Sequence, residues 1–189
     1  MRRKVVAVIG DSRIEEDSIK YKIAFETGKA LVEAGYRVQT GGLDGVMKAV
    51  FMGAHNAKNY REGDTIAIIP SFARDNANDC ADIVIPTGLD VMRNGIVVNA
   101  DAVVIIGGGA GTLSEAALAW SLYRLIIAYQ NVDGWSRELA GKRLDGRVRY
   151  KEIDDKVYGV EDVSDMINIL KRYEEVYVRV HKSIKTKEN

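Results

Sequence analysis

The stretch VVIIGGGAGTLSEAALAW, residues 103–120, combines residue types that suit phosphate chemistry. A run of apolar residues leads into three glycines, and a threonine and a glutamate follow shortly after. Glycines let the backbone adopt positive φ and approach a ligand closely. A helix that begins near Thr112 would add unpaired N–H groups and the positive end of its dipole, which together favour a phosphate group. The candidate contacts are Gly107, Gly108, Gly109, Gly111 and Thr112.

This stretch differs from better-known nucleotide motifs. A dinucleotide GxGxxG follows the first strand of a sheet, and a Walker P-loop continues into Gly-Lys-Ser/Thr; neither condition holds here. Ser114 is not a convincing nucleophile, because it does not lie in a GxSxG elbow. Nicotinamide-dependent chemistry and ATP hydrolysis are therefore disfavoured.

Glu115 has two interpretations. The residues TLSE, 112–115, fit a capping box in which Thr112 caps the helix and Glu115 reaches back to the cap N–H. Alternatively, Glu115 faces the ligand from the first helical turn, where the dipole favours the ionised carboxylate. Such a carboxylate suits ribose binding or stabilisation of an oxocarbenium ion and would be a poor general acid. The sequence leaves both interpretations open.

Two further corners carry small or polar residues, GDSR at 10–13 and TGGLDG at 40–45. Ligands of open parallel sheets bind at the carboxyl ends of the strands, so we expect the three corners to form one site. Asp11 and Ser12 could both be turn residues after the strand, although Ser12 is favoured as a ligand contact. Asp44 is interpreted as the N-cap of the following helix. The candidate ligand contacts from these two corners are Gly10, Ser12, Gly41 and Gly42.

The elements that must position these corners follow from the apolar pattern. Continuous apolar runs predict strands at 4–10, 36–40, 64–70, 81–87, 101–107 and 125–130, and helical spacing predicts helices at 18–35, 44–57, 89–100, 112–124 and 160–176. Strands of this kind separated by helices indicate a parallel sheet covered on both faces. The predicted fold class is α/β, with a doubly wound, mainly parallel, Rossmann-like sheet in three layers. We expect one domain over residues 1–180 and a flexible basic tail at 181–189.

The composition narrows the function classes. The chain has 189 residues, of which 27 are basic and 27 acidic, and this balance argues against a large nucleic-acid surface. Its single cysteine, Cys80, excludes an internal disulfide, and with only two histidines a zinc site is disfavoured. No apolar run approaches the ~20 residues of a membrane span, and the N-terminus predicts a strand rather than a signal peptide. We expect a cytoplasmic protein without metal, membrane or nucleic-acid partners.

Other conspicuous side chains have structural explanations. His55 is expected to face outward from its helix, and Cys80 to be a small buried apolar residue. Trp120 is expected in the core. The run at 136–156 mixes charges of both signs and is predicted to be a solvated surface.

The corners resemble those of a known family. GGAGTLSE, residues 108–115, resembles the PGGxGTxxE signature of the Lonely Guy (LOG) family, long labelled "possible lysine decarboxylase". TGGLDGVMKAVFMGA, residues 40–54, resembles that family's glycine loop and Gly-x-Met helix, and VMRN, residues 91–94, occupies the place of its arginine motif. The resemblance covers roughly residues 4–130. It is greatest to the nucleotide-binding branch related to DNA-processing protein A, which also resembles molybdenum cofactor carriers.

The resemblance implies a phosphoribohydrolase. Such an enzyme cleaves the N-glycosidic bond of a nucleoside 5′-monophosphate and releases the base and ribose 5-phosphate. The matching positions assign catalytic roles to Glu115 and Arg93 and phosphate binding to residues 108–112. Without the resemblance, Arg93 could equally be the partner of a surface ion pair. The decarboxylase label is disfavoured, because nothing in the sequence marks a Schiff-base lysine.

Two positions depart from the LOG pattern. Gly107 stands where LOG enzymes have proline, and Asn94 stands where they have lysine after the arginine. The absent lysine removes a cation, so Asn94 is expected to contact the ligand while hydrolysis loses weight. The alternatives are a non-catalytic nucleotide sensor and a molybdenum cofactor carrier-like protein with a pterin-type ligand, and no cofactor is required. By analogy with such relatives we expect a homodimer or larger homo-oligomer.

Overall fold

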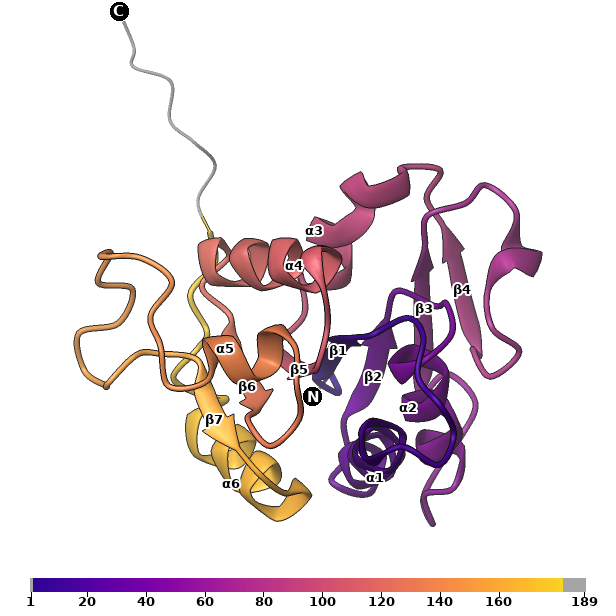
Figure 1. The fold of residues 1–189 in the computed structure, drawn as a ribbon, viewed down its shortest axis with the longest axis horizontal. Helices are drawn as coiled ribbons and strands as arrows, with labels where there is room; N and C mark the ends of the chain where they lie inside the picture. The colour runs from indigo at the N-terminus through magenta and orange to yellow at the C-terminus, as the bar shows by residue number, and fades with distance from the viewer. Residues whose placement is uncertain (1, 182–189) are drawn as a thin grey trace, which may run out of the picture.

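The protein is built on one sheet of seven parallel strands in a computed structural model that describes residues 2–181 (Figure 1). The strands are β1 (Val5–Gly10), β2 (Arg37–Thr40), β3 (Thr65–Ile69), β4 (Ile83–Pro86), β5 (Ala102–Ile106), β6 (Leu125–Tyr129) and β7 (Tyr158–Val160). Their order is β4-β3-β2-β1-β5-β6-β7, and every pairing is parallel. The predicted doubly wound α/β fold class is confirmed.

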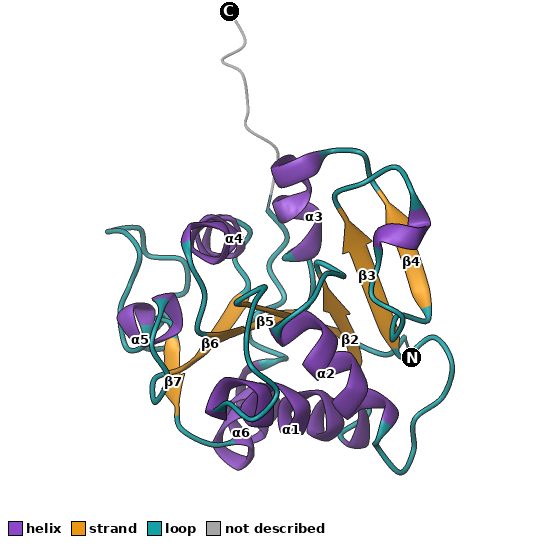
Figure 2. Cartoon of the chain, turned by 45° about the vertical axis from the view of Figure 1, so that its right-hand side comes forward, coloured by secondary structure: helices purple, strands orange, loops and turns teal. Residues whose placement is uncertain are grey.

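Helices cover both faces of the sheet (Figure 2). The helices are α1 (Ile19–Glu33), α2 (Val46–His55), α3 (Asn94–Val97), α4 (Ala110–Ser121), α5 (Trp135–Leu139) and α6 (Val163–Tyr173), with short 3-10 helices η1 (Arg74–Asn76) and η2 (Asp90–Arg93). Residues of α1, α2 and α6 share one buried cluster with the sheet, and residues of α3, α4 and α5 share another. Each buried cluster lies between one layer of helices and the central sheet. The predicted three-layer architecture is therefore confirmed.

Strand β5 shows why the strands of this sheet can be predicted from the sequence. All five of its residues are buried. Val104 and Ile106 belong to the first core, whereas Val103 and Ile105 belong to the second. A strand that is buried on both faces has no place for a polar residue, which is why it appears as a continuous apolar run.

Several predicted boundaries are wrong. The helix predicted at 89–100 is replaced by η2 and the single turn of α3, and Asp90 at the start of η2 has a φ of 48° that an α-helix does not allow. The helix after β2 has Gly45 as its N-cap, so Asp44 does not have the role predicted for it. No helix or strand was predicted between residues 130 and 160, but this segment forms α5 and the edge strand β7.

The run 136–156 also contains a buried ion pair, which contradicts its prediction as a solvated surface. Arg149 and Asp155 are 2% and 3% exposed. Two nitrogens of Arg149 donate to the two carboxylate oxygens of Asp155, at 2.9 and 2.6 Å. The guanidinium also lies 3.5 Å from the ring centroid of Trp120. This segment therefore folds back onto α4 and the sheet through polar contacts that apolar periodicity does not register.

Three other side chains considered in the sequence, Trp120, His55 and Cys80, differ in their exposure to solvent. Trp120 is 1% exposed, as expected for the core. His55 faces outward as predicted, whereas Cys80 is only partly buried. Within residues 2–181, no helix is long and apolar enough to cross a membrane. Apart from His181, the tail predicted at 181–189 lies outside the described residues.

Candidate ligand-binding site

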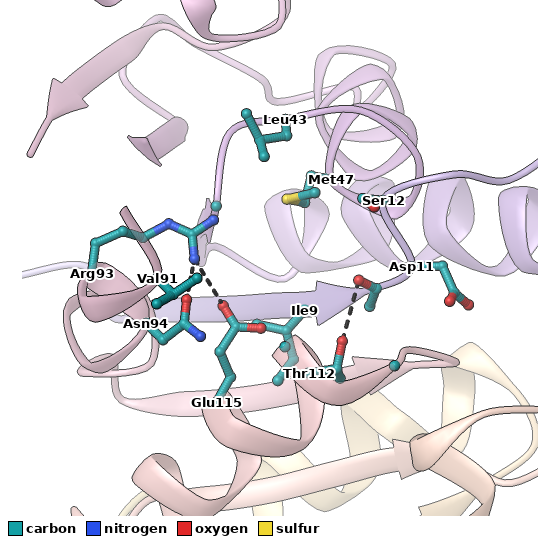
Figure 3. A pocket seen from close by; sticks show the side chains of 14 residues that line it. Ile9, Asp11, Ser12, Leu43, Met47, Val91, Arg93, Asn94, Thr112 and Glu115 are labelled. Atoms are coloured by element: carbon teal, nitrogen blue, oxygen red, sulfur yellow. Dashed lines mark hydrogen bonds and ion pairs between the residues drawn. The ribbon is translucent and has the colours of Figure 1, made fainter. Parts of the chain in front are cut away.

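A cavity of about 470 Å³ opens at the carboxyl edge of the sheet (Figure 3). It lies beside β1, at the point where the strand order reverses between β1 and β5, which is where ligands of doubly wound sheets bind. Four segments distant in the sequence form its walls: the end of β1, the loop after β2, the η2–α3 segment and the start of α4.

Most of the sequence-derived candidates meet in this cavity. Its lining includes Gly10, Ser12, Gly41, Arg93, Asn94, Gly109, Gly111, Thr112 and Glu115. Gly42, Gly107 and Gly108 lie outside the lining. The lining also contains residues that sequence reasoning did not assign to the site: Ile9, Asp11, Leu43, Met47 and Val91. Asp11 and Leu43 lie inside the quoted glycine corners and Met47 lies in the family-like stretch 40–54, but their own types carried no ligand signal.

Gly107 and Gly108 shape the turn after β5 instead of facing the cavity. Their φ angles are 64° and 98°, which favour glycine. A Cβ at Gly107 would lie 2.3 Å from Asp11 Oδ2, and one at Gly108 would lie 2.4 Å from the Thr112 hydroxyl. Proline cannot adopt the φ of Gly107, so this turn follows a different path from one that carries proline there.

Gly109 and Gly111 have the other role predicted for glycine, which is to let a ligand approach the backbone closely. Both line the cavity, and a Cβ at either position would meet no heavy atom within 4 Å. Gly109 is the N-cap of α4 and Gly111 lies in its first turn, where backbone N–H groups have no intrahelical acceptor. The open space therefore lies beside backbone donors and the positive end of the helix dipole.

We expect alanine substitutions to separate these two kinds of glycine. Gly107→Ala should lower the free energy of unfolding by at least about 1 kcal/mol, because alanine is strained at this φ and its Cβ collides with Asp11. Gly111→Ala should leave it unchanged or raise it by up to about 1 kcal/mol, because alanine favours a helix. Denaturant unfolding of both variants checks this, and equal losses would contradict the distinction.

Thr112 does not cap the helix. Helix α4 begins at Ala110, three residues earlier than the capping box requires, and no side chain among the described residues caps it. The Thr112 hydroxyl instead donates to the carbonyl oxygen of Gly10 at 3.3 Å and so ties α4 to the end of β1. The capping interpretation of Glu115 is therefore wrong, because its supposed N-cap lies inside the helix.

Glu115 lies in the second turn of α4 and is 8% exposed. Burial raises its pKa to about 7, against the opposing effect of the Arg93 charge. The two side chains face each other with 3.7 Å between Arg93 Nη1 and Glu115 Oε1. Desolvation outweighs the charge of Arg93, so the ionised form of Glu115 is less favoured than its place near the helix N-terminus implies. Glu115 can exchange a proton near neutral pH.

Arg93 enters the cavity from the end of η2 (Figure 3). Its Nη1 donates to Asn94 Oδ1, and Asn94 Nδ2 donates to Ser114 Oγ at 2.8 Å. Its Nε is buried and has no hydrogen-bond partner among the described residues. A buried donor without an acceptor calls for an explanation, and a ligand in the cavity provides one. The surface ion-pair interpretation of Arg93 is wrong, because the side chain is only 11% exposed.

Asn94 was expected to contact the ligand, but its side-chain amide is held by other side chains of the protein. It is 5% exposed and lines the cavity, but both ends of its amide are engaged, by Arg93 and by Ser114. Ser114 Oγ in turn donates to the carbonyl oxygen of Gly111 at 2.8 Å. Asn94 therefore links the arginine to the first turns of α4.

The wall opposite Arg93 and Glu115 is apolar. Figure 3 shows Leu43 and Met47 across the opening from them. These two side chains offer a surface on which a flat ring can pack, and Val91 adds an apolar side chain beside Arg93 on η2. The cavity thus joins an anion-binding end, a carboxyl–guanidinium pair and an apolar wall.

Comparisons with known proteins agree with this geometry. The SLOG cluster4 family matches residues 3–159. An uncharacterized protein of Archaeoglobus fulgidus is 39% identical over 120 residues, which are 63% of this chain and 75% of that protein.

Several solved structures have the same fold, and two of those reported below are named for the molybdenum cofactor. The X-ray structure of TM1055 has a TM-score of 0.75 and 30% identity, covering 89% of this chain and 99% of its own. The molybdenum cofactor binding protein of Rippkaea orientalis has a TM-score of 0.73 and 32% identity, covering 91% and 98%. The molybdenum cofactor carrier protein of Chlamydomonas reinhardtii has a TM-score of 0.69 and 25% identity, covering 90% and 98%.

A more distant structure shows the fold alone. DNA processing protein A of Helicobacter pylori, described with a single-stranded DNA binding mode, has a TM-score of 0.61 and 19% identity, covering 89% of this chain and 80% of its own. The suggested LOG-like family and the likeness to molybdenum cofactor carriers are confirmed, and the likeness to DNA processing protein A is one of fold.

Proposed function

The chain belongs to the SLOG cluster4 family, and on that premise we propose that its cavity binds a nucleoside 5′-monophosphate and hydrolyses the N-glycosidic bond. The observation that carries the proposal is the buried pair of Glu115 and Arg93 at the floor of the cavity. A carboxyl group whose pKa lies near neutrality, in a cleft and beside one cation, is typical of a functional site.

In this proposal, the chemistry of each wall of the cavity determines which part of the ligand lies against it. The phosphate lies at the first turn of α4, near Gly109, Gly111 and Thr112, where backbone donors face open space. The base packs against the apolar wall of Leu43, Met47 and Val91. The ribose then lies between them, beside Glu115.

Hydrolysis adds water to the anomeric carbon of the ribose and breaks the bond to the base nitrogen. In the net reaction a proton passes from the water to the departing base. Glu115 can accept that proton and return it, because its two protonation states are nearly equal in free energy at neutral pH. While ionised, it also stabilises positive charge that develops on the sugar. Arg93 holds the substrate through its guanidinium, whose Nε has no acceptor among the described residues.

We expect the purified protein to release free base from at least one member of a panel of nucleoside 5′-monophosphates. Its kcat/KM should rise with pH and level off above about 7, because the reaction begins with the carboxylate form of Glu115 and a raised pKa removes that form at lower pH. Chromatography of the products at several pH values checks both points. A rate that falls as pH rises through 7 would reverse the role assigned to Glu115.

A second candidate is a carrier of a pterin-type cofactor. The names of the Rippkaea and Chlamydomonas structures favour it. Asn94 also favours it, because it leaves the cavity with one fewer cation than a lysine would provide. Tight retention of a phosphorylated pterin, with no base released from any nucleotide, would replace the hydrolase proposal with this one.

The expectations about cellular context belong to the same proposal. Balanced charge supports a site for small molecules instead of nucleic acid, and the likeness to DNA processing protein A is one of fold. Exposed apolar side chains beside the cavity, Val91 and Met92 on η2, support a homo-oligomer. We propose a cytoplasmic homo-oligomer that needs no cofactor for hydrolysis.

A further inference from the structure

Lys20 lies on α1, outside the cavity lining, yet it reaches the turn that precedes α4. Its Nζ lies 2.7 Å from Asp11 Oδ2 and 3.0 Å from Asp133 Oδ1. The same Asp11 oxygen accepts a hydrogen bond from the backbone N–H of Gly108 at 3.0 Å. One lysine thus joins α1, the end of β1 and the loop before α5 to the glycine turn.

The Asp11 carboxylate has a stabilising role and an electrostatic cost. It holds the glycine turn by accepting a hydrogen bond from the Gly108 N–H. Asp11 also lines the cavity, so its negative charge lies at the end where we place the phosphate. A carboxylate at that place would repel the phosphate unless a cation compensates it.

Lys20 is placed to provide this compensation. Its side chain is 15% exposed and that of Asp11 is 26% exposed, so water screens the pair only in part. Burial lowers the pKa of Lys20, but hydrogen bonds to Asp11 and Asp133 outweigh it and raise that pKa, so the ammonium stays charged. Asp133 competes weakly, because its side chain is 81% exposed.

The turn is otherwise held without Lys20. Trp135 N donates to the carbonyl of Gly108 and Ser136 N to the carbonyl of Gly107, each at 3.0 Å. Ser136 Oγ accepts from the N–H of Gly107 at 2.9 Å. Because these bonds fix the turn, the charge of Lys20 is available for a role beyond folding.

We propose that Lys20 is a positioning residue for the phosphate subsite: it neutralises Asp11, which lets the carboxylate hold the glycine turn without repelling the bound anion. The inference rests on the proposed phosphate site and names the residue pair that makes that site tolerant of an anion. Lys20 acts through Asp11 and needs no contact with the ligand.

The test is a double-mutant cycle read by binding of AMP and of inorganic phosphate. We expect Lys20→Met to weaken binding about 10-fold, equivalent to about 1.4 kcal/mol, because Asp11 is left uncompensated. Asp11→Asn in the Lys20→Met background should restore binding to within about 3-fold of wild type, since asparagine keeps an acceptor for Gly108 N–H without the charge. Lys20→Arg should bind as wild type.

Salt dependence separates charge from structure. The deficit of Lys20→Met should shrink as salt rises, because screening weakens the repulsion by Asp11. Thermal unfolding of each variant reports whether the fold is intact, and the neutral double variant tests the inference if the single variant is too unstable. A double variant as weak as Lys20→Met, or a deficit independent of salt, would overturn the role of Lys20 alone. A wild-type protein that binds neither probe would overturn the phosphate site and this inference with it.

Discussion

Replacing Glu115 with glutamine is expected to reduce base release by at least about 100-fold and, at the same time, to stabilise the fold at alkaline pH. Glutamine has nearly the same shape but can neither accept a proton from water nor carry the negative charge that faces the sugar. Removing a positioned acid–base group typically costs 100-fold to 10,000-fold in rate. Release of free base from the best nucleotide of the panel measures the loss.

The stability effect follows from the raised pKa. Between the ordinary value of 4.5 and the folded value of about 7, the folded state binds more protons than the unfolded state. The stability associated with protonated Glu115 is therefore fully present below pH 4.5 and is lost as pH rises through 7. The shift corresponds to roughly 3 kcal/mol, and it is not discounted for solvent because the residue is buried.

Glu115→Gln cannot titrate, so it escapes this loss. We expect the variant to be about 2–3 kcal/mol more stable than wild type at pH 8 and equally stable at pH 4.5. Denaturant unfolding at the two pH values measures the difference. Glu138→Gln is a matched control, because its carboxylate is 62% exposed and pairs only with Lys142 on the surface. Identical pH dependence in Glu115→Gln and wild type would show that Glu115 is not desolvated.

The fold was accessible from the sequence because its central strands are buried on both faces. β5 and β6 have no exposed residue, so their apolar runs are continuous and their ends are marked by glycine or by a polar residue. The parallel order then places the corners at 10–13, 40–45 and 107–112 on one edge, and the cavity forms there. Local pattern and topology were enough to locate the site.

The chemistry of the site was less accessible, because it depends on contacts between distant segments. Thr112 and Glu115 have capping-box spacing, but the helix begins three residues earlier than that spacing implies, and Thr112 bonds to Gly10 instead. The pKa of Glu115 is set by burial beneath segments far away in the sequence, which no local pattern reports. The sequence interpretation of Asn94 rested on the lysine that LOG enzymes have at this position. In the structure its amide joins Arg93 to Ser114.

The same limit explains the misinterpretation of residues 136–156. Charged residues in a mixed run usually indicate solvent exposure. Here Arg149 is satisfied by Asp155, by the carbonyl oxygens of Trp120 and Arg124, and by the face of the Trp120 ring. Its partners are side chains and carbonyl groups assembled only in the folded chain.

Replacing Arg149 with methionine is expected to cause the largest loss of stability of any substitution considered for this protein, about 3–5 kcal/mol. The change leaves the Asp155 carboxylate buried without its cation and removes the Arg149 donor from the carbonyl oxygens of Trp120 and Arg124, although the Trp120 oxygen keeps the backbone N–H of Tyr123. Tyr177 still donates to Asp155 Oδ1, at 2.7 Å, but one neutral hydrogen bond does not replace a bidentate ion pair. A loss of this size would lower Tm by roughly 10 °C.

The experiment is a comparison of four proteins by thermal and denaturant unfolding. Arg147→Met is the control, because this arginine is two positions away and pairs with Asp145 while 59% exposed, so its removal should cost less than about 1 kcal/mol. Arg149→Met should cost several times more. The double variant Arg149→Met with Asp155→Asn should recover at least about 1 kcal/mol of that loss, because most of the cost of the single change is the stranded carboxylate. If Arg149→Met unfolds like Arg147→Met, the buried pair contributes nothing to stability, and the return of residues 145–157 onto α4 must depend on apolar contacts instead.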